Sequence, residues 1–136
     1  MKKDEWGPII WKLLHCLTIK IKDESFPKKK KELINTILSI FSNLPCPYCS
    51  SHAMSLSRKL NLTKINDKNK LIKALYIIHN LVNKKLKKKE LSYDIIETYN
   101  KYIMKEAVVD YINAINKSNY SERMMLYNFK KKQFIN

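Results

Sequence analysis

The sequence predicts an all-α protein, a four-helix bundle with a fifth, short helix packed across it. The chain of 136 residues contains one glycine, whereas doubly wound nucleotide-binding folds and all-β folds need several for their turns. Apolar residues form 45% and charged residues 29% of the chain, as is typical of a globular protein with one buried core. We therefore expect one main domain, residues 1–116, followed by a C-terminal helix or tail over residues 117–136.

Proline positions and apolar spacing predict the first three helices. Pro8 suits the first turn of a helix, because proline has no N–H to leave unpaired there, and the first helix is expected over residues 8–22. A second helix is expected over residues 25–42, where apolar residues recur at helical spacing. Pro47 is expected to open a third helix that runs to about residue 60, with Cys46 as its cap.

Two more helices are expected further along the chain. Asn66 or Asp67 is a suitable cap for the fourth, and Ser92 for a fifth that extends through Ile112. The fourth has the most regular apolar spacing, so we expect it to bury one continuous stripe. The members of this stripe are Leu71, Ile72, Leu75, Ile78, His79, Val82 and Leu86.

The formal net charge of +15 raises the expectation of an anionic partner, such as nucleic acid or a phosphate-bearing cofactor. The lysines are scattered in runs, at residues 28–31, 84–89 and 130–132, as on an ordinary solvated surface. The net charge leaves one alternative function, which is that of a basic helical module that binds nucleic acid or is stabilised by zinc. The chain shows neither the apolar segment of a secretory signal nor the ~20 apolar residues of a membrane span, so no membrane partner is expected.

Cys46 and Cys49 lie three residues apart in Leu44-Pro45-Cys46-Pro47-Tyr48-Cys49-Ser50-Ser51-His52. Two such thiols can close a disulfide or hold two corners of a metal site. Pro47 would place both sulfurs at the positive end of a helix dipole, which favours the thiolate and lowers the cysteine pKa. A zinc site normally needs a second pair of ligands, and the sequence has no second CxxC and no HxxxH. The pattern favours a redox pair, and no metal site is expected.

Two further groups of residues suggest a bound ligand. Gly7, Trp11 and His15 are spaced four apart and so share one helix face, although taken alone Trp11 and His15 could belong to an ordinary core. Asn80 and Asn83 lie within the fourth expected helix, where asparagine is a poor residue. Polar donors beside apolar groups suit a flat, partly polar aromatic ligand. The residues that share this face are His79, Val82, Asn83 and Leu86.

Lysines follow the polar face at the end of the same helix. Lys84, Lys85 and Lys88 offer cations to phosphates at the rim of such a ligand site. Lys88 is nine residues from His79 and therefore about half a turn round the helix. It can reach the same ligand only if the helix ends or bends before it.

Three stretches together resemble the FAD-linked sulfhydryl oxidases of the Erv/ALR type. They are Gly7-x-x-x-Trp11-x-x-x-His15, Pro45-Cys46-x-x-Cys49-x-x-His52 and His79-Asn80-x-Val82-Asn83-x-x-Leu86-x-Lys88. They occur in the family's order and at about its spacing, over residues 6–100. The resemblance implies a helical bundle that holds FAD, in agreement with the absence of the G-x-G-x-x-G fingerprint of dinucleotide-binding folds.

The resemblance also implies a site. Cys49 would lie against the isoalloxazine ring of FAD and Cys46 would be the outward thiol. Gly7 would let the chain approach the cofactor closely, and Lys85 would contact a phosphate or ribose. Either Tyr99 or Tyr102 would replace a tryptophan of the family. Together with the helix face described above, the expected cofactor-binding residues are Gly7, Trp11, His15, His52, His79, Asn80, Val82, Asn83, Lys85, Leu86, Lys88 and Tyr99.

The chain departs from the family pattern at several positions. Leu44 stands where the family often has an aromatic residue, and Lys87 stands where it has a glycine. The structural disulfides and shuttle cysteines of longer members have no counterparts. Cys16 is therefore unpaired and is expected to be a small buried side chain.

The implied function is that of an FAD-dependent thiol oxidase that forms disulfide bonds in partner proteins. Electrons would pass from the Cys46–Cys49 pair to FAD and then to O₂, which gives H₂O₂. Because the chain has no shuttle dithiol, the electron donor is expected to be a separate small redox protein. The resemblance also implies a homodimer. Trp6-Gly7 and Leu44-Pro45-Cys46-Pro47 are most similar to short forms encoded by poxviruses and other large DNA viruses, which implies the host cytoplasm or the virion.

Overall fold

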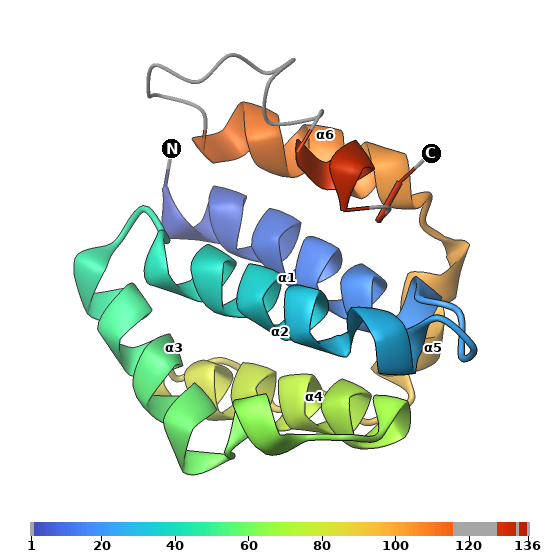
Figure 1. The fold of residues 1–136 in the computed structure, drawn as a ribbon. Coiled ribbons are helices and arrows are strands. Elements are labelled where there is room, and N and C mark those ends of the chain that lie inside the picture. Colours follow the sequence, from blue (N-terminus) through green and yellow to red (C-terminus); the bar gives the residue numbers. More distant parts are fainter. Residues whose placement is uncertain (1, 116–127, 133, 136) are drawn as a thin grey trace.

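The computed structural model describes residues 2–115, 128–132 and 134–135, and these residues form helices without a strand (Figure 1). The all-α prediction is confirmed. The elements are α1 (Lys3–Lys20), α2 (Phe26–Ser42), α3 (Pro47–Lys59), η1 (Leu62–Lys64), α4 (Lys68–Lys85), α5 (Ile95–Thr98), η2 (Tyr99–Lys101) and α6 (Met104–Ile115), where η is a 3₁₀ helix.

Helix α1 is the centre of the bundle. It contacts α2, α4, η2 and α6, and Leu13, Leu14 and Leu17 on it are almost completely buried. The core is therefore built around α1 from several sides. Figure 1 shows the beginning of α1, the end of α2, the beginning of α3 and the end of α4 at the same end of the bundle. This arrangement brings the three sequence stretches singled out above to one place.

Helix α1 begins at Lys3, so the prediction that it begins at Pro8 is wrong. Pro8 lies inside the helix and removes one backbone hydrogen bond there. The first turn forms nevertheless, with the amide N–H groups of Glu5 and Trp6 donating to the Lys2 carbonyl. Asp4 and Glu5 complement the positive end of the helix dipole, and Trp6 is buried. These gains offset the bond that Pro8 removes.

Helices α3 and α4 begin where the sequence predicted. Pro47 is the first residue of α3, and the Cys46 sulfur caps it by accepting from the Cys49 N–H at 3.1 Å. Asp67 caps α4 by accepting from the Lys70 N–H at 2.9 Å. The predicted stripe of α4 is buried from Leu71 through His79, but Val82 and Leu86 are only half-buried. They lie at the end of the helix, where it borders the cavity described below.

The fifth helix is not continuous, and this prediction is wrong. Residues Ile95–Thr98 form α5, the chain then passes through η2, and α6 begins only at Met104. Tyr102 is extended, with ψ of 150°, and Ile103 is 58% exposed. The break turns the chain so that α6 packs along α1. No proline or glycine marks this break, and the tyrosines beside it contact α1: Tyr99 stacks on His15, and the Lys12 ammonium lies 4.2 Å from the Tyr102 ring centroid.

The C-terminal prediction covers residues 117–136, of which residues 117–127, 133 and 136 lie outside the described part. The described residues include a helical turn at residues 128–131. Phe129 and Ile135 are buried against the core, and the Lys132 ammonium donates to the Thr36 hydroxyl at 3.2 Å. Within the described residues, no helix is both long and apolar enough to cross a membrane.

Candidate functional site

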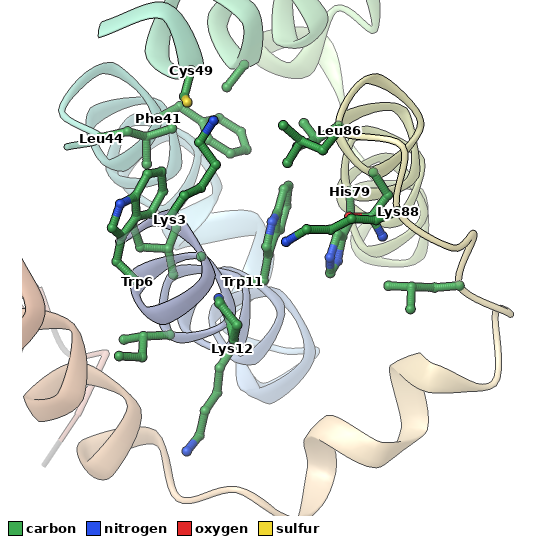
Figure 2. A pocket seen from close by; sticks show the side chains of 18 of the residues that line it. Lys3, Trp6, Trp11, Lys12, Phe41, Leu44, Cys49, His79, Leu86 and Lys88 are labelled. Carbon is green, nitrogen blue, oxygen red and sulfur yellow. The ribbon is translucent and has the colours of Figure 1, made fainter. Parts of the chain in front are cut away.

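A cavity of about 540 Å³ lies where α1, α3 and the end of α4 meet (Figure 2). Its volume is in the range of sites for small molecules and cofactors. Side chains from the loop after α4 and from η2 complete its wall. The predicted site residues that line it are Gly7, Trp11, Cys49, His52, His79, Val82, Asn83, Lys85, Leu86, Lys88 and Tyr99.

One side of the cavity is a set of stacked rings, which we call the aromatic wall and which consists of Trp11, His79, His15 and Tyr99. Trp11 stacks on His79 with ring centroids 4.0 Å apart and planes 4° from parallel. His15 lies behind this pair, 0% exposed, with its Nε2 2.9 Å from Nδ1 of His79. Tyr99 stacks on the His15 ring at 4.6 Å. The result is a flat, rigid surface of the kind on which another planar ring can stack.

The two histidines of the aromatic wall are held neutral. Burial lowers the pKa of His15 to about 3, and burial together with the charge of Lys88 lowers that of His79 to about 4. The Nδ1 atom of His15 is buried and has no hydrogen-bond partner. A bare acceptor nitrogen is less costly there than an orphaned N–H, so we assign the hydrogen to His15 Nε2, which donates to His79 Nδ1. His79 then carries its own hydrogen on Nε2, where it can serve a ligand in the cavity.

The redox pair lies on another side of the same cavity. Cys46 and Cys49 form a disulfide at the beginning of α3, as the pattern of two cysteines favoured. Cys49 lines the cavity, whereas Cys46 is half-buried and does not line it. Tyr48 between them is 61% exposed, with the Lys85 ammonium 5.0 Å from its ring centroid. Within the described residues, no group of three or more His, Cys, Asp or Glu side chains could hold a metal ion.

The position of Gly7 indicates whether a ligand fits this cavity. It is the only glycine of the chain and lies inside α1, where glycine is less favourable than alanine by roughly 0.5–1 kcal/mol. A Cβ atom added to Gly7 would meet no protein atom within 4 Å. No described residue therefore requires a glycine there, whereas a ligand that approached the Gly7 backbone closely would. A flat ring on the aromatic wall and close to Gly7 satisfies this condition.

Cationic groups surround the cavity as well. Lys3, Lys12, Lys85, Lys88 and Lys89 line it. The Lys88 ammonium pairs with Asp4 at 3.5 Å, and that of Lys12 pairs with Asp110 at 3.6 Å. Ammonium groups at a cavity edge suit the phosphates of a nucleotide. The residues present thus fit FAD, which combines planar rings with two phosphates.

Lys88 reaches the cavity because α4 stops before it. The helix ends at Lys85, and Lys87 adopts a left-handed conformation with φ of 59°. The Lys88 N–H then bonds back to the Asn83 carbonyl at 2.8 Å, and the Lys87 N–H to the Lys84 carbonyl at 3.1 Å. This is the Schellman arrangement that usually has glycine at the left-handed residue. It explains why a family glycine is expected at position 87.

Two predicted cofactor-binding residues do not line the cavity. His15 lies behind His79. The amide of Asn80 bonds to the backbone of Leu91 in both directions, accepting from its N–H at 2.8 Å and donating to its carbonyl at 3.0 Å. Asn80 therefore holds the loop after α4, and Leu91 of that loop lines the cavity. Direct contact of His15 or Asn80 with the cofactor stays a prediction.

Several residues that line the cavity were not predicted from the sequence. Phe41 packs edge-on against Trp11, with centroids 6.1 Å apart. Lys3 could have been found, because it lies four residues before Gly7 on the same helix face. Tyr99 and Tyr102 both line the cavity, and only Tyr99 stacks on His15. The residues that were not predicted are Lys3, Trp6, Pro8, Ile9, Ile10, Lys12, Phe41, Leu44, Tyr48, Ala53, Lys89, Leu91, Ile95 and Asp110.

A helical bundle with a disulfide on the wall of a cavity of this size fits a flavin-linked thiol oxidase. Comparison with protein-family models agrees, because the model of the Erv1/Alr family matches residues 8–105. The chain therefore belongs to the Erv1/Alr family, and it is an FAD-dependent sulfhydryl oxidase that oxidises thiols using O₂. Comparisons with curated proteins and with solved structures gave no match.

Proposed function

We propose that this oxidase takes its electrons from a separate small protein that carries a cysteine pair, and that Cys46 is the sulfur this partner attacks. A thiolate of the partner forms a bond to Cys46 while the Cys46–Cys49 bond breaks, and Cys49 leaves as a thiolate. The partner's second thiolate then attacks the partner's other sulfur in the mixed disulfide, and Cys46 leaves as a thiolate. The partner gains a disulfide, and Cys46 and Cys49 hold the two electrons.

The chain's own residues have distinct roles in this step. The dipole at the beginning of α3 favours the thiolate forms of both cysteines. Trp11 and neutral His79 hold a planar ring close to Cys49, and Lys85 and Lys88 hold phosphates. Bound FAD supplies the acceptor for the two electrons, which end on O₂ as H₂O₂.

One observation supports this proposal above the others. The Cys46–Cys49 disulfide joins a sulfur on the cavity wall to a sulfur outside that wall. A pair placed in this way can be reduced from outside and reoxidised from inside. The chain's third cysteine, Cys16, is fully buried and far along the sequence from the pair, so it does not provide a shuttle.

Oxygen uptake with dithiothreitol tests the proposed step. The purified protein should be yellow and should consume O₂, whereas Cys49→Ser should bind flavin and lose activity by about 100-fold or more. Cys16→Ala is the matched control and should keep the activity. Equal rates in Cys49→Ser and in the unchanged protein would exclude the proposed role of the pair.

We also propose that the protein is a homodimer encoded by a large DNA virus and acts in the host cytoplasm or the virion. The support is the resemblance of Trp6-Gly7 and Leu44-Pro45-Cys46-Pro47 to short viral forms. A light-scattering mass of twice 16.2 kDa would support the dimer, and a mass of 16.2 kDa at all concentrations would contradict it. Fractionation of infected cells and of purified virions tests the location.

A further inference from the structure

Helices α2, α3 and α4 place few acidic residues at the end of the bundle that carries Cys46, and the first turn of α1 adds Asp4 and Glu5 there (Figure 1). Between Glu32 and Glu90, Asp67 is the only aspartate or glutamate in the sequence. Asp67 caps the beginning of α4, and this helix of 18 residues is about 27 Å long. The end of α4 that lies near α3 is therefore remote from it (Figure 1). Helices α2, α3 and α4 thus bring almost no negative charge to the surroundings of the disulfide.

Several lysines at this end have no counter-ion among the described residues. Lys3 and Lys85 both line the cavity with Cys49, and Figure 2 shows the Lys3 side chain extending toward Cys49. Within the part of the chain that the structure describes, neither of them nor exposed Lys84 forms a salt bridge. Asp4, an acidic side chain on the first turn of α1, is already paired with Lys88. A positive field therefore surrounds the disulfide, to which the beginning of α3 adds its dipole.

An exposed aromatic ring lies in the middle of this positive field. Tyr48, between the two cysteines, is 61% exposed, although tyrosine is a residue that proteins often use to anchor a partner. The Lys85 ammonium beside its ring keeps a cation within reach of whatever contacts Tyr48. Exposed prolines flank Cys46 on both sides and stiffen the surface there.

We infer that this end of the bundle is a docking surface for a dithiol segment whose cysteine pair is flanked by acidic side chains, with Tyr48 as the apolar contact. The inference rests on the proposed function, in which Cys46 receives the partner's thiolate. Acidic flanks raise the encounter rate with a basic surface, and Lys3 and Lys84 hold them. The same lysines repel basic dithiols, which would make the oxidase selective among thiol substrates.

Two reduced peptides test the inference on the flavin-loaded enzyme. They share one CxxC core and differ only in their flanks, which are glutamates in one peptide and lysines in the other. We expect kcat/KM for O₂ uptake to be about tenfold higher with the glutamate peptide at low salt, and the difference to shrink at high salt. Lys3→Glu should lower the ratio of the two values, whereas Lys105→Glu on α6, the same charge change at the other end of α1, should not.

The outcomes separate the inference from the proposed function. Dithiothreitol is the uncharged reference substrate, and failure to oxidise it would contradict the proposed function itself. Oxidation of dithiothreitol with equal kcat/KM for the two peptides would overturn only the docking surface. Single-stranded DNA that competes with the glutamate peptide at a lower concentration than the peptide's own KM would assign the basic end to nucleic acid and also overturn it. Because each ratio is measured on one enzyme, partial loss of flavin in a variant does not affect it.

Discussion

The aromatic wall and the disulfide turn border the same cavity but are built in opposite ways. His15 and His79 are buried, neutral and stacked, and they are held by partners from different helices. Cys46 and Tyr48 lie at the beginning of α3 and are half-buried and exposed, respectively, so they are held mainly by the local capping of one helix. The cofactor is served by a rigid wall, whereas the redox pair must stay within reach of a thiol substrate.

Removing the largest ring from the aromatic wall should have the largest effect. Trp11→Ala deletes the surface on which the His79 ring stacks, and flavin affinity should fall by about 100-fold or more. Trp11→Phe keeps a ring and should lose about tenfold or less. Flavin absorbance after dialysis measures both variants. The Cys46–Cys49 disulfide should still form in Trp11→Ala, because its cap belongs to α3, and its loss would contradict the separation of the two regions.

The buried histidines should make stability depend on pH. The pKa of His15 is about 3 and that of His79 about 4 in the folded protein, against 6.5 for an unperturbed histidine. At a pH between these folded values and 6.5, the unfolded chain therefore binds more protons than the folded protein. The free energy of unfolding is therefore not reduced by these histidines above about pH 6.5. It falls as the pH falls below that value, by up to about 1.4 kcal/mol per pH unit for each histidine. Urea unfolding at several pH values measures this slope.

A variant of His15 isolates its share of the slope. His15→Leu removes one of the two buried titrations and should reduce the slope below about pH 6 by about half. His52→Gln is the control, because His52 is only half-buried and its pKa is lowered less strongly. An unchanged slope in His15→Leu would show that His15 is protonated in the folded protein.

A substitution at Gly7 should change protein stability and flavin affinity in opposite directions. Gly7→Ala should stabilise the flavin-free protein by roughly 0.5–1 kcal/mol, because alanine is the better helix residue and its Cβ meets no protein atom. The same Cβ enters the cavity, so flavin affinity should fall by about tenfold. Thermal unfolding and flavin titration measure the two effects. Unchanged flavin affinity would mean that no ligand group approaches Gly7.

The end of α4 should affect stability alone, without a change in flavin affinity. Lys87 has φ of 59°, and a left-handed conformation costs a non-glycine residue about 1–2 kcal/mol. Lys87→Gly should therefore stabilise the protein by about 1 kcal/mol and leave Lys88 in place. Lys84→Gly, inside the helix, should destabilise it by about 1 kcal/mol. Chemical unfolding distinguishes the two, and destabilisation by Lys87→Gly would contradict the observed turn.

Local features of the sequence predicted much of the site. Pro47 and Cys46 form the beginning of α3 as predicted, because a first-turn proline and a cap depend only on neighbouring residues. The beginning of α1 was predicted incorrectly at Pro8, because burial of Trp6 outweighed a backbone rule. The break after η2 was not predicted, because the stacking of Tyr99 on His15 joins residues that are far apart in the sequence.

The sequence alone determined the all-α fold class, the redox pair and its cap, and the residue types that a flavin site needs, since composition, caps and periodicity are local properties. Only the tertiary structure decided that Asn80 holds Leu91, that Trp11 stacks on His79, and that Cys49 rather than Cys46 lines the cavity. These facts depend on how α1, α3 and α4 approach one another. That approach is set by burial of the whole core, which no single stretch of sequence contains.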